Sequence, residues 1–428
     1  MRRGAPAPLL AAGLAAVVLL LGAACDDSPG SAPPARRAAP PETCAGVRPS
    51  LGCEAIEVDG RVYRYAIRAA KGGAGSRDAA LVDLGGPGRS LFGSDDLLRF
   101  AAGWPGDQAL VFVEEPWVTR PSTGGCDAAR SGFYRSLRRS GENGEPATAL
   151  VTACGLARSG SWGWDAADYA RVVQAIARHE RLVLTGLVAT SYGALRSAPL
   201  WSLPSLRWLV LDSPAPPKET GTSYLRARAR GVASALRRSC APCPDRAREA
   251  SAELRRDPVA LDTRTPAVEP VDLEAALVAA AYLPAGQRRA LFRLLGGPVR
   301  RAAPLIGRLS DATLLRYGSY EMSPAVLAYL DEVCRRYGPW PAASERPNLL
   351  ARLHAPCRSL WRPAGDADLP TGPADVCIAH GGLDDVVPRD TVARWRTVFP
   401  RARAVALRDA VHGAPELAAE CYRVAVTR

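Results

Sequence analysis

The chain is poor in lysine and histidine and contains almost no long apolar runs. Only Lys71 and Lys218 are lysines among its 428 residues, so arginine carries nearly all of the formal net charge of +12. The arginines are scattered and no RNA- or DNA-binding motif accompanies them, so we expect a solvated basic surface and no nucleic-acid partner. With 47% hydrophobic and 23% charged residues, the composition excludes a wholly disordered chain, a collagen-like repeat and a polytopic membrane protein.

The long apolar run of the sequence lies at the amino terminus. Two arginines precede an apolar stretch over residues 9–21 and small residues follow it, so we predict an export signal over residues 1–24. Cys25 comes next and resembles the lipidated cysteine of a bacterial lipoprotein, although Gly22 stands where that motif usually has leucine. Residues 25–43 are rich in Pro and Ala and predict a flexible tether. We therefore expect an exported protein, either attached to the outer face of the membrane through Cys25 or secreted.

The cysteine count agrees with export. Of the 11 cysteines, those other than Cys25 are even in number, which suits an oxidising compartment. Spacing predicts the pairs Cys44–Cys53, Cys126–Cys154, Cys240–Cys243, Cys334–Cys357 and Cys377–Cys421. The Cys-x-x-Cys spacing of Cys240 and Cys243 also occurs in redox motifs and in half of a zinc site. Since no second such pair and no clustered histidines accompany it, we expect a structural disulfide and neither a metal nor an organic cofactor.

Short apolar runs alternate with helical patterns over much of the chain. Runs of strand length lie at 54–58, 62–67, 79–84, 109–113, 182–189, 208–211, 376–379 and 404–407. Helical spacing at 165–178 and 391–398 separates some of them. This alternation implies a mostly parallel sheet with helices on both faces.

The pattern changes in the middle of the chain. Helical stretches dominate from about 215 to about 370, and strand-like runs are scarce there. We therefore assign residues 44–214 and 371–428 to one α/β domain, and residues 215–370 to a helical cap inserted into it.

A serine lies between a predicted strand and a predicted helix. Ala189-Thr190-Ser191-Tyr192-Gly193 is the Gly-x-Ser-x-Gly nucleophile elbow with alanine at its first position. Small residues two before and two after Ser191 let the backbone turn sharply and expose the hydroxyl. Serine is a weak nucleophile without a neighbouring base, so the motif requires a histidine elsewhere in the chain.

Of the four histidines, His412 has the position that this chemistry needs. It follows the last predicted strand and precedes Gly413, which is where the histidine of an α/β-hydrolase lies. His179 is expected as a solvated cap at the end of its helix. His380 ends a strand, where it could contact the site, but a structural role is favoured. His354 is expected on the surface of the helical block.

The carboxylate comes from the loop after the strand predicted at 376–379. Asp384 and Asp385 compete for the role, and the spacing to Pro388 favours Asp384. The order Ser191, Asp384, His412 is the Ser…Asp…His order of the α/β-hydrolases.

These motifs resemble those of the secreted proline iminopeptidase and tripeptidyl aminopeptidase group, which are α/β-hydrolase serine peptidases with a helical cap. The likeness is carried by Gly85-Gly86-Pro87-Gly88, Ser191-Tyr192-Gly193, Leu209-Val210-Leu211-Asp212-Ser213-Pro214, residues 381–388 and His412-Gly413. The resemblance implies the α/β-hydrolase fold and an oxyanion hole made by the backbone N–H groups of Gly86 and Tyr192. Two features depart from the group: Ala189, and Glu115-Pro116-Trp117 in place of its Asp-Pro-Arg segment.

The expected function is an exported serine hydrolase that acts on a peptide or a small acyl substrate. The resemblance favours an aminopeptidase that releases N-terminal residues or short peptides by way of an acyl-enzyme. Such an enzyme needs a buried carboxylate for the substrate ammonium, and the cap candidates are Glu219, Glu321, Asp331 and Glu332. An esterase or amidase on the same scaffold, or a catalytically silent cell-surface binding protein, are the alternatives.

Overall fold

The computed structural model describes residues 44, 51–71, 76–92, 95–139, 144–262, 265–316, 321–342, 348–362 and 369–426. The predicted signal, the tether and Cys25 lie outside the described residues. None of the helices in these ranges has both the length and the apolar character that crossing a membrane requires.

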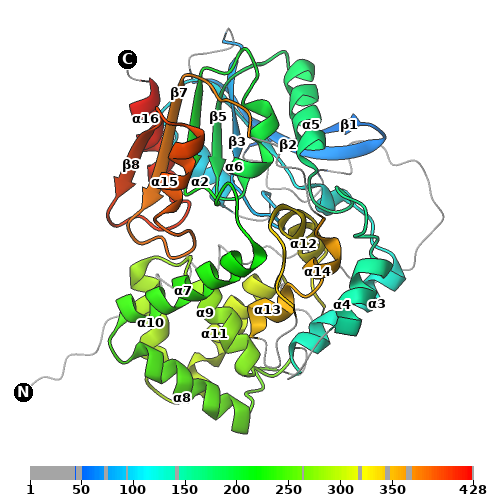
Figure 1. Ribbon diagram of the computed structural model, residues 1–428, viewed down its shortest axis with the longest axis vertical. Coiled ribbons are helices and arrows are strands. Elements are labelled where there is room, and N and C mark those ends of the chain that lie inside the picture. The colour runs from blue at the N-terminus through cyan, green and yellow to red at the C-terminus, as the bar shows by residue number, and fades with distance from the viewer. Residues whose placement is uncertain are drawn as a thin grey trace, which may run out of the picture.

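An eight-stranded sheet forms one half of the molecule (Figure 1). Its strands, in spatial order, are β1 (Cys53–Val58), β2 (Arg61–Arg68), β4 (Ala109–Val113), β3 (Asp78–Asp83), β5 (Val183–Thr190), β6 (Trp208–Asp212), β7 (Asp375–Gly381) and β8 (Arg403–Leu407). The strands from β4 to β8 run parallel, whereas β1 and β2 form an antiparallel hairpin at one edge. This is the α/β-hydrolase fold, so the fold class expected from the sequence is confirmed.

Helices cover both faces of the sheet, because successive strand residues point to opposite sides. Helices α2 (Asp96–Gly103) and α16 (Pro415–Val426) pack on one face, and α5 (Ala166–His179) and α15 (Thr391–Val398) pack on the other. All residues of β4 and β6 are buried. Burial on both faces explains why these strands appear in the sequence as unbroken apolar runs.

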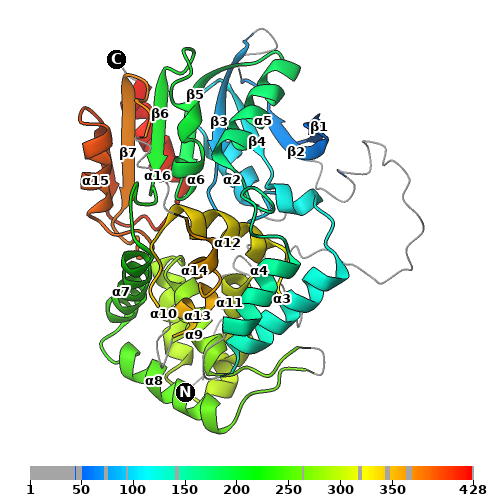
Figure 2. The same ribbon diagram turned by 45° about the vertical axis from the view of Figure 1, so that its right-hand side comes forward.

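A helical half lies against the carboxyl ends of the parallel strands, as Figures 1 and 2 both show. It contains the helices between β6 and β7, which are α7 (Gly221–Ser239), α8 (Cys243–Arg256), α9 (Pro270–Ala280), α10 (Ala285–Leu294), α11 (Val299–Leu314), α12 (Ala325–Arg336), α13 (Leu349–Leu353) and α14 (Cys357–Leu360). We call these helices the cap.

Two further helices join the cap although they precede β5 in the chain. Helices α3 (Gly124–Leu137) and α4 (Gly144–Ala153) share a buried apolar cluster with α12, in which Phe133 and Leu150 pack with Leu330. The sequence-based division placed them with the sheet, because it followed chain order rather than packing.

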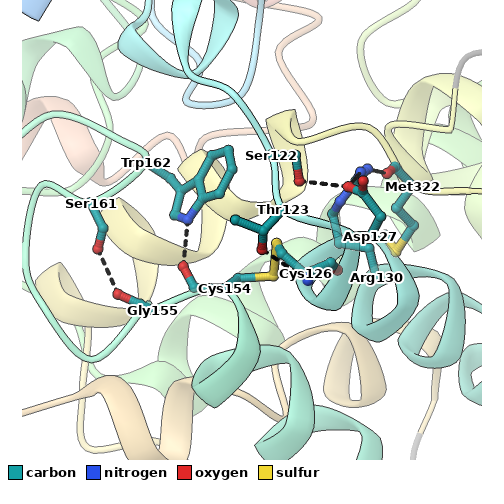
Figure 3. Close-up of a disulfide and its surroundings, with 10 residues drawn as sticks. All are labelled: Ser122, Thr123, Cys126, Asp127, Arg130, Cys154, Gly155, Ser161, Trp162 and Met322. Carbon is teal, nitrogen blue, oxygen red and sulfur yellow. Dashed lines mark hydrogen bonds and ion pairs between the residues drawn. A yellow bond between two sulfur atoms is a disulfide. The ribbon is translucent and has the colours of Figure 1, made fainter. Parts of the chain in front are cut away.

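The five predicted cysteine pairs are the disulfides of the structure. Figure 3 shows Cys126–Cys154, which joins α3 to the end of α4, and Trp162, whose indole N–H donates to the Cys154 carbonyl at 2.7 Å. Cys240 and Cys243 are bonded to each other, and the described residues contain no cluster of side chains suited to a metal ion.

Candidate active site

Ser191 occupies a tight turn between β5 and the single-turn helix α6 (Gly193–Arg196). Its φ is +52°, a left-handed conformation that residues with a side chain seldom adopt. The turn is fixed on both sides: the Ser191 N–H donates to the Asp212 carbonyl at 2.9 Å, and the Ala215 N–H donates to the Ser191 carbonyl at 2.9 Å. Ser191 lines a pocket at the carboxyl edge of the sheet.

The small residues of the elbow differ in how much space their neighbours leave for a side chain. A β-carbon on Gly193 would lie 2.5 Å from Asp83 Oδ1, so a larger residue there requires the buried Asp83 side chain to move. Ala189 is fully buried in β5, where its methyl group is accommodated. The alanine that departs from the usual motif is thus compatible with the turn, whereas Gly193, two residues after the serine, has no space for a side chain beside Asp83.

The structure brings His412 and Asp384 together. His412 Nδ1 lies 2.9 Å from Asp384 Oδ2, and Asp384 Oδ1 accepts the N–H groups of Val386 and Val387 at 2.8 and 3.0 Å. Burial acts to raise the pKa of Asp384, but His412 and the backbone N–H groups outweigh it and lower the pKa to about 2. Since an ionised carboxylate can only accept, Nδ1 of His412 is the donor, and Nε2 is the ring nitrogen that this contact leaves available.

The loop of His412 reaches the nucleophile turn. The Gly413 N–H donates to Ser213 Oγ at 3.2 Å, and a β-carbon on Gly413 would lie 3.0 Å from Thr190, the residue before the serine. No hydrogen bond joins Ser191 to His412 in this structure. Bonds between nucleophile and base are often long without substrate and tighten when it binds.

Asp385 has a different role from Asp384. Its buried carboxylate is paired with Arg238 of α7 and Arg288 of α10. A β-carbon on Gly231 of α7 would lie 1.8 Å from the Asp385 carbonyl oxygen, so the cap helix lies directly against this loop. Asp384 therefore holds the histidine while its neighbour attaches the cap to the sheet.

The expectation that His354 lies on the surface is wrong. The residue is 2% exposed, its Nδ1 lies 2.7 Å from the Leu350 carbonyl oxygen, and its Nε2 lies 2.8 Å from the Tyr329 hydroxyl. Burial lowers the pKa of His354 to about 4, so the ring is neutral at pH 7 and both nitrogens are satisfied. A neutral, fully paired imidazole can be buried without the cost of a buried charge.

Of the other two histidines, His179 lies apart from Asp384 and His412, whereas His380 contacts the loop that carries Asp384. His179 is exposed in the last turn of α5, and His380 Nε2 lies 3.3 Å from the Val387 carbonyl oxygen. Neither histidine lines the pocket over Ser191.

The backbone N–H groups of Gly86 and Tyr192 have no acceptor among the described residues. The neighbouring amides are taken, because Gly85 donates to Asp83 Oδ1 at 2.9 Å and Gly88 donates to Glu115 Oε2 at 2.6 Å. Both Gly86 and Tyr192 line the pocket with Ser191. Unpaired backbone N–H groups beside a serine hydroxyl are able to stabilise an oxyanion.

Glu114 and Glu115, for which the sequence predicted no role, hold the loop of Gly86. The Glu114 carboxylate accepts the N–H groups of Leu91 at 2.9 Å and Phe92 at 3.3 Å. Glu115 lies directly behind Gly86, where a β-carbon would be 2.6 Å from Glu115 Oε1. The signal in the sequence was a pair of acidic residues directly after a fully apolar strand.

A buried ionic cluster supports this loop from behind. Arg196 lies 3.1 Å from carboxylate oxygens of Asp83 and of Glu115, and 3.6 Å from Glu332. Burial raises the pKa of Glu115 to about 7 and that of Glu332 well above its usual range, against the opposing effect of Arg196. Glu115, which stands where the sequence departs from the peptidase group that it resembles, thus contributes an ion pair to the wall behind Gly86.

The pocket over Ser191 lies between the sheet and the cap. Its cap-side lining includes Glu219, Tyr224, Arg228, Tyr329 and Tyr337. Of the four predicted ammonium-binding candidates, Glu219 lines the pocket, while Glu321 is exposed away from it. Asp331 and Glu332 instead accept backbone N–H groups, of Trp162 and Trp164 respectively, both at 2.9 Å.

Comparison with known proteins gives distant structural neighbours. No protein-family model and no curated protein matches the chain. A proline iminopeptidase-related protein from Thermus thermophilus is similar at 16% identity and a TM-score of 0.39, over 88% of this chain and 97% of that one. A hydrolase from Pseudomonas aeruginosa is similar at 14% identity and a TM-score of 0.41, over 89% and 97%. The fold assignment rests on the strand order.

Proposed function

We propose that the protein is a serine hydrolase with Ser191 as nucleophile, His412 as general base and Asp384 as the residue that orients the histidine. The observation that carries the proposal is the left-handed Ser191 at the strand-to-helix turn, facing a pocket beside two unpartnered backbone N–H groups. A histidine held by an ionised carboxylate lies on the adjacent loop.

The proposed reaction proceeds in two stages. Ser191 Oγ attacks the acyl carbon while His412 Nε2 takes its proton, and the N–H groups of Gly86 and Tyr192 stabilise the tetrahedral oxyanion. His412 then gives the proton to the leaving group, which departs and leaves an acyl-enzyme. Water attacks the ester while His412 takes its proton, and His412 returns this proton to Ser191 Oγ as the acid is released. Asp384 stabilises the imidazolium in both stages and stays ionised.

Labelling of the purified protein with a fluorophosphonate probe tests this assignment. We expect labelling of the wild type and none of Ser191→Ala. Ser202→Ala is the matched control, because Ser202 is exposed and outside the pocket. A wild-type protein that resists the probe would favour the binding-protein alternative, and a labelled Ser191→Ala variant would show a different nucleophile.

Among serine hydrolases, we propose an aminopeptidase that acts on short peptides. The support is Glu219, whose side chain is 3% exposed and whose ion-pair partner, Arg394 Nη1, is 3.9 Å away. Burial raises the pKa of Glu219, and a substrate ammonium would compensate that burial. We expect Glu219→Gln to raise KM for aminoacyl arylamides and to leave KM for their N-acetylated forms unchanged. Faster turnover of p-nitrophenyl esters than of any arylamide would favour the esterase alternative.

We also propose that the protein is exported, with a lipid on Cys25 or in secreted form. The support is the amino-terminal sequence pattern and the five disulfides. Growth of the producing cells with labelled palmitate tests the lipid: a Cys25-dependent label would establish the anchored form, and an unlabelled protein in the medium would establish secretion.

A further inference from the structure

Arg228 of α7 projects into the same pocket as Ser191 and is held there by tyrosines. Its Nη1 donates to the Tyr282 hydroxyl at 2.7 Å, and its Nη2 donates to the Tyr224 hydroxyl at 3.3 Å. The guanidinium carbon lies 5.2 Å from the centre of the Tyr224 ring and 5.9 Å from that of Tyr282. These contacts fix the position of the charged group and favour it through the electron-rich ring faces.

Arg228 differs from the other arginines around the site because it has no carboxylate partner. Arg196, Arg238 and Arg288 are each paired with at least one buried carboxylate. Across the part of the chain that the structure describes, no carboxylate oxygen lies within 4.0 Å of the Arg228 guanidinium. The two tyrosine hydroxyls accept two of its five N–H groups, and the others have no acceptor among these residues.

The hydrogen bonds behind Arg228 can run in one direction only. The Leu350 carbonyl accepts from His354 Nδ1, so Nε2 of this neutral ring must accept from the Tyr329 hydroxyl. The Tyr329 oxygen, 2.8 Å from the Tyr224 hydroxyl, therefore accepts the Tyr224 proton, and the Tyr224 oxygen accepts from Arg228. The buried network thus presents oxygen to the cation and keeps both tyrosines protonated, so it orients the charge of Arg228 without neutralising it.

We propose that Arg228 binds a carboxylate of the substrate and so determines specificity within the proposed hydrolase activity, on which this inference rests. A guanidinium matches a carboxylate through two parallel N–H···O bonds, and an unpaired cation in a pocket gains most from such a partner. Glu219 lines the same pocket and would receive a positive group, so the pocket is suited to a zwitterionic peptide.

The carboxylate could stand on either side of the scissile bond. The Tyr282 hydroxyl accepts from Arg228, and the Tyr282 ring packs against the His412 ring with centroids 5.5 Å apart. The guanidinium therefore lies near the group that would protonate the leaving amine. A free carboxyl terminus of the leaving peptide is one source. The other is an acidic side chain on the residue that is released.

Binding to the Ser191→Ala protein tests the inference without turnover. One pair of ligands is a short neutral peptide with a free carboxyl terminus and its carboxamide. The second pair has carboxamide ends and differs only by Glu or Gln at the first position. In calorimetric titration we expect the carboxylate member of one pair to bind roughly tenfold to hundredfold more tightly than its uncharged amide counterpart. The pair that discriminates identifies the source of the carboxylate.

Arg228 variants in the same background assign the effect. Arg228→Gln should remove the discrimination, and Arg228→Lys should retain a part of it, because the charge stays but the planar fork is lost. Arg226→Gln is the matched control, since Arg226 is an exposed arginine on the same helix. Thermal unfolding of each variant checks that the fold is retained, and Arg228→Lys serves if the glutamine variant does not fold.

The outcomes separate this inference from the proposed function. If neither pair discriminates, or if the preference persists in a folded Arg228→Gln variant, the inference is wrong even when the wild type reacts with the fluorophosphonate. If a preference depends on Arg228 but the wild type never reacts with that probe, the carboxylate site stands and the hydrolase proposal fails.

Discussion

The two halves of the molecule contribute to the pocket in different ways. The sheet side presents main-chain groups, namely the N–H groups of Gly86 and Tyr192 and the turn that carries Ser191. The cap side presents long side chains, with tyrosines around Arg228 and Glu219. Backbone geometry restricts residue type at fixed spacings, whereas a side-chain lining can change without any change of fold. The proposed reaction therefore belongs to the sheet and the proposed specificity to the cap.

The largest expected effect distinguishes two adjacent aspartates, one of which orients the proposed base while the other attaches the cap. Asp384→Asn should reduce kcat by about 10⁴-fold, because the amide no longer holds the correct histidine tautomer. Asp385→Asn should leave kcat within a few-fold but lower the melting temperature, because Arg238 and Arg288 lose their shared carboxylate. Steady-state kinetics and thermal unfolding measure the two effects. Equal loss of kcat in both variants would contradict the distinction.

A substitution in the oxyanion loop should have the next largest effect. In Gly86→Ala the new methyl group would meet Glu115 Oε1, and a φ of +125° is unfavourable for alanine. We expect kcat to fall by about 10²- to 10³-fold, as for loss of one oxyanion donor, with KM little changed. Gly103→Ala is the control, since nothing lies within 4 Å of a β-carbon there. A rise in KM with unchanged kcat would show that Gly86 contributes to substrate binding and not to catalysis.

Removal of a cap side chain should act mainly on binding. Tyr282→Phe deletes the hydroxyl that accepts from Arg228 but keeps the ring beside His412. We expect KM for carboxylate-bearing peptides to rise by roughly threefold to tenfold, and kcat to stay within twofold, because the loss is one hydrogen bond to a charged group. The matched carboxamide peptides should show no change in KM. A fall in kcat for both kinds of peptide would place Tyr282 on the catalytic side of the comparison.

The last change concerns stability at the carboxyl end of β6. Burial raises the pKa of Asp212 to about 8, while the Ser213 hydroxyl opposes this effect and the charge of Asp384 adds to it. Because the folded state holds this proton more tightly than the unfolded chain, Asp212 reduces stability as pH rises from about 4 to about 8. Asp212→Asn should flatten the fall in free energy of unfolding over that range. Denaturant unfolding at several pH values measures it, and an unchanged pH slope would refute the assignment.

The parts that could be predicted from the sequence are those fixed by local geometry. The strands, the Asp59-Gly60 hairpin turn, with φ of 51° and 74°, and the spacing of Ser191 to Gly193 follow from backbone requirements over a few residues. The contact of Asp384 with His412 could be expected from strand order, because both loops follow neighbouring parallel strands.

The rest depends on how helices distant in the chain pack together. Helices α3 and α4 belong with the cap through contacts with α12, and His354 is buried because Tyr329 and Leu350 satisfy its two nitrogens. No pattern within a single helix records such partners. The same holds for Arg228, which in the sequence is one of several arginines on α7 and differs from them only in what surrounds it.

The disulfide between Cys377 and Cys421 closes a ring whose ends are 44 residues apart in the chain, and that ring contains both Asp384 and His412. The proposed base and its orienting acid are therefore tethered to each other even when the chain is denatured. The covalent link limits how far they can drift apart and lowers the entropy lost when they meet again. Ser191 lies outside the ring, so only the nucleophile must find its partners through folding of the whole sheet.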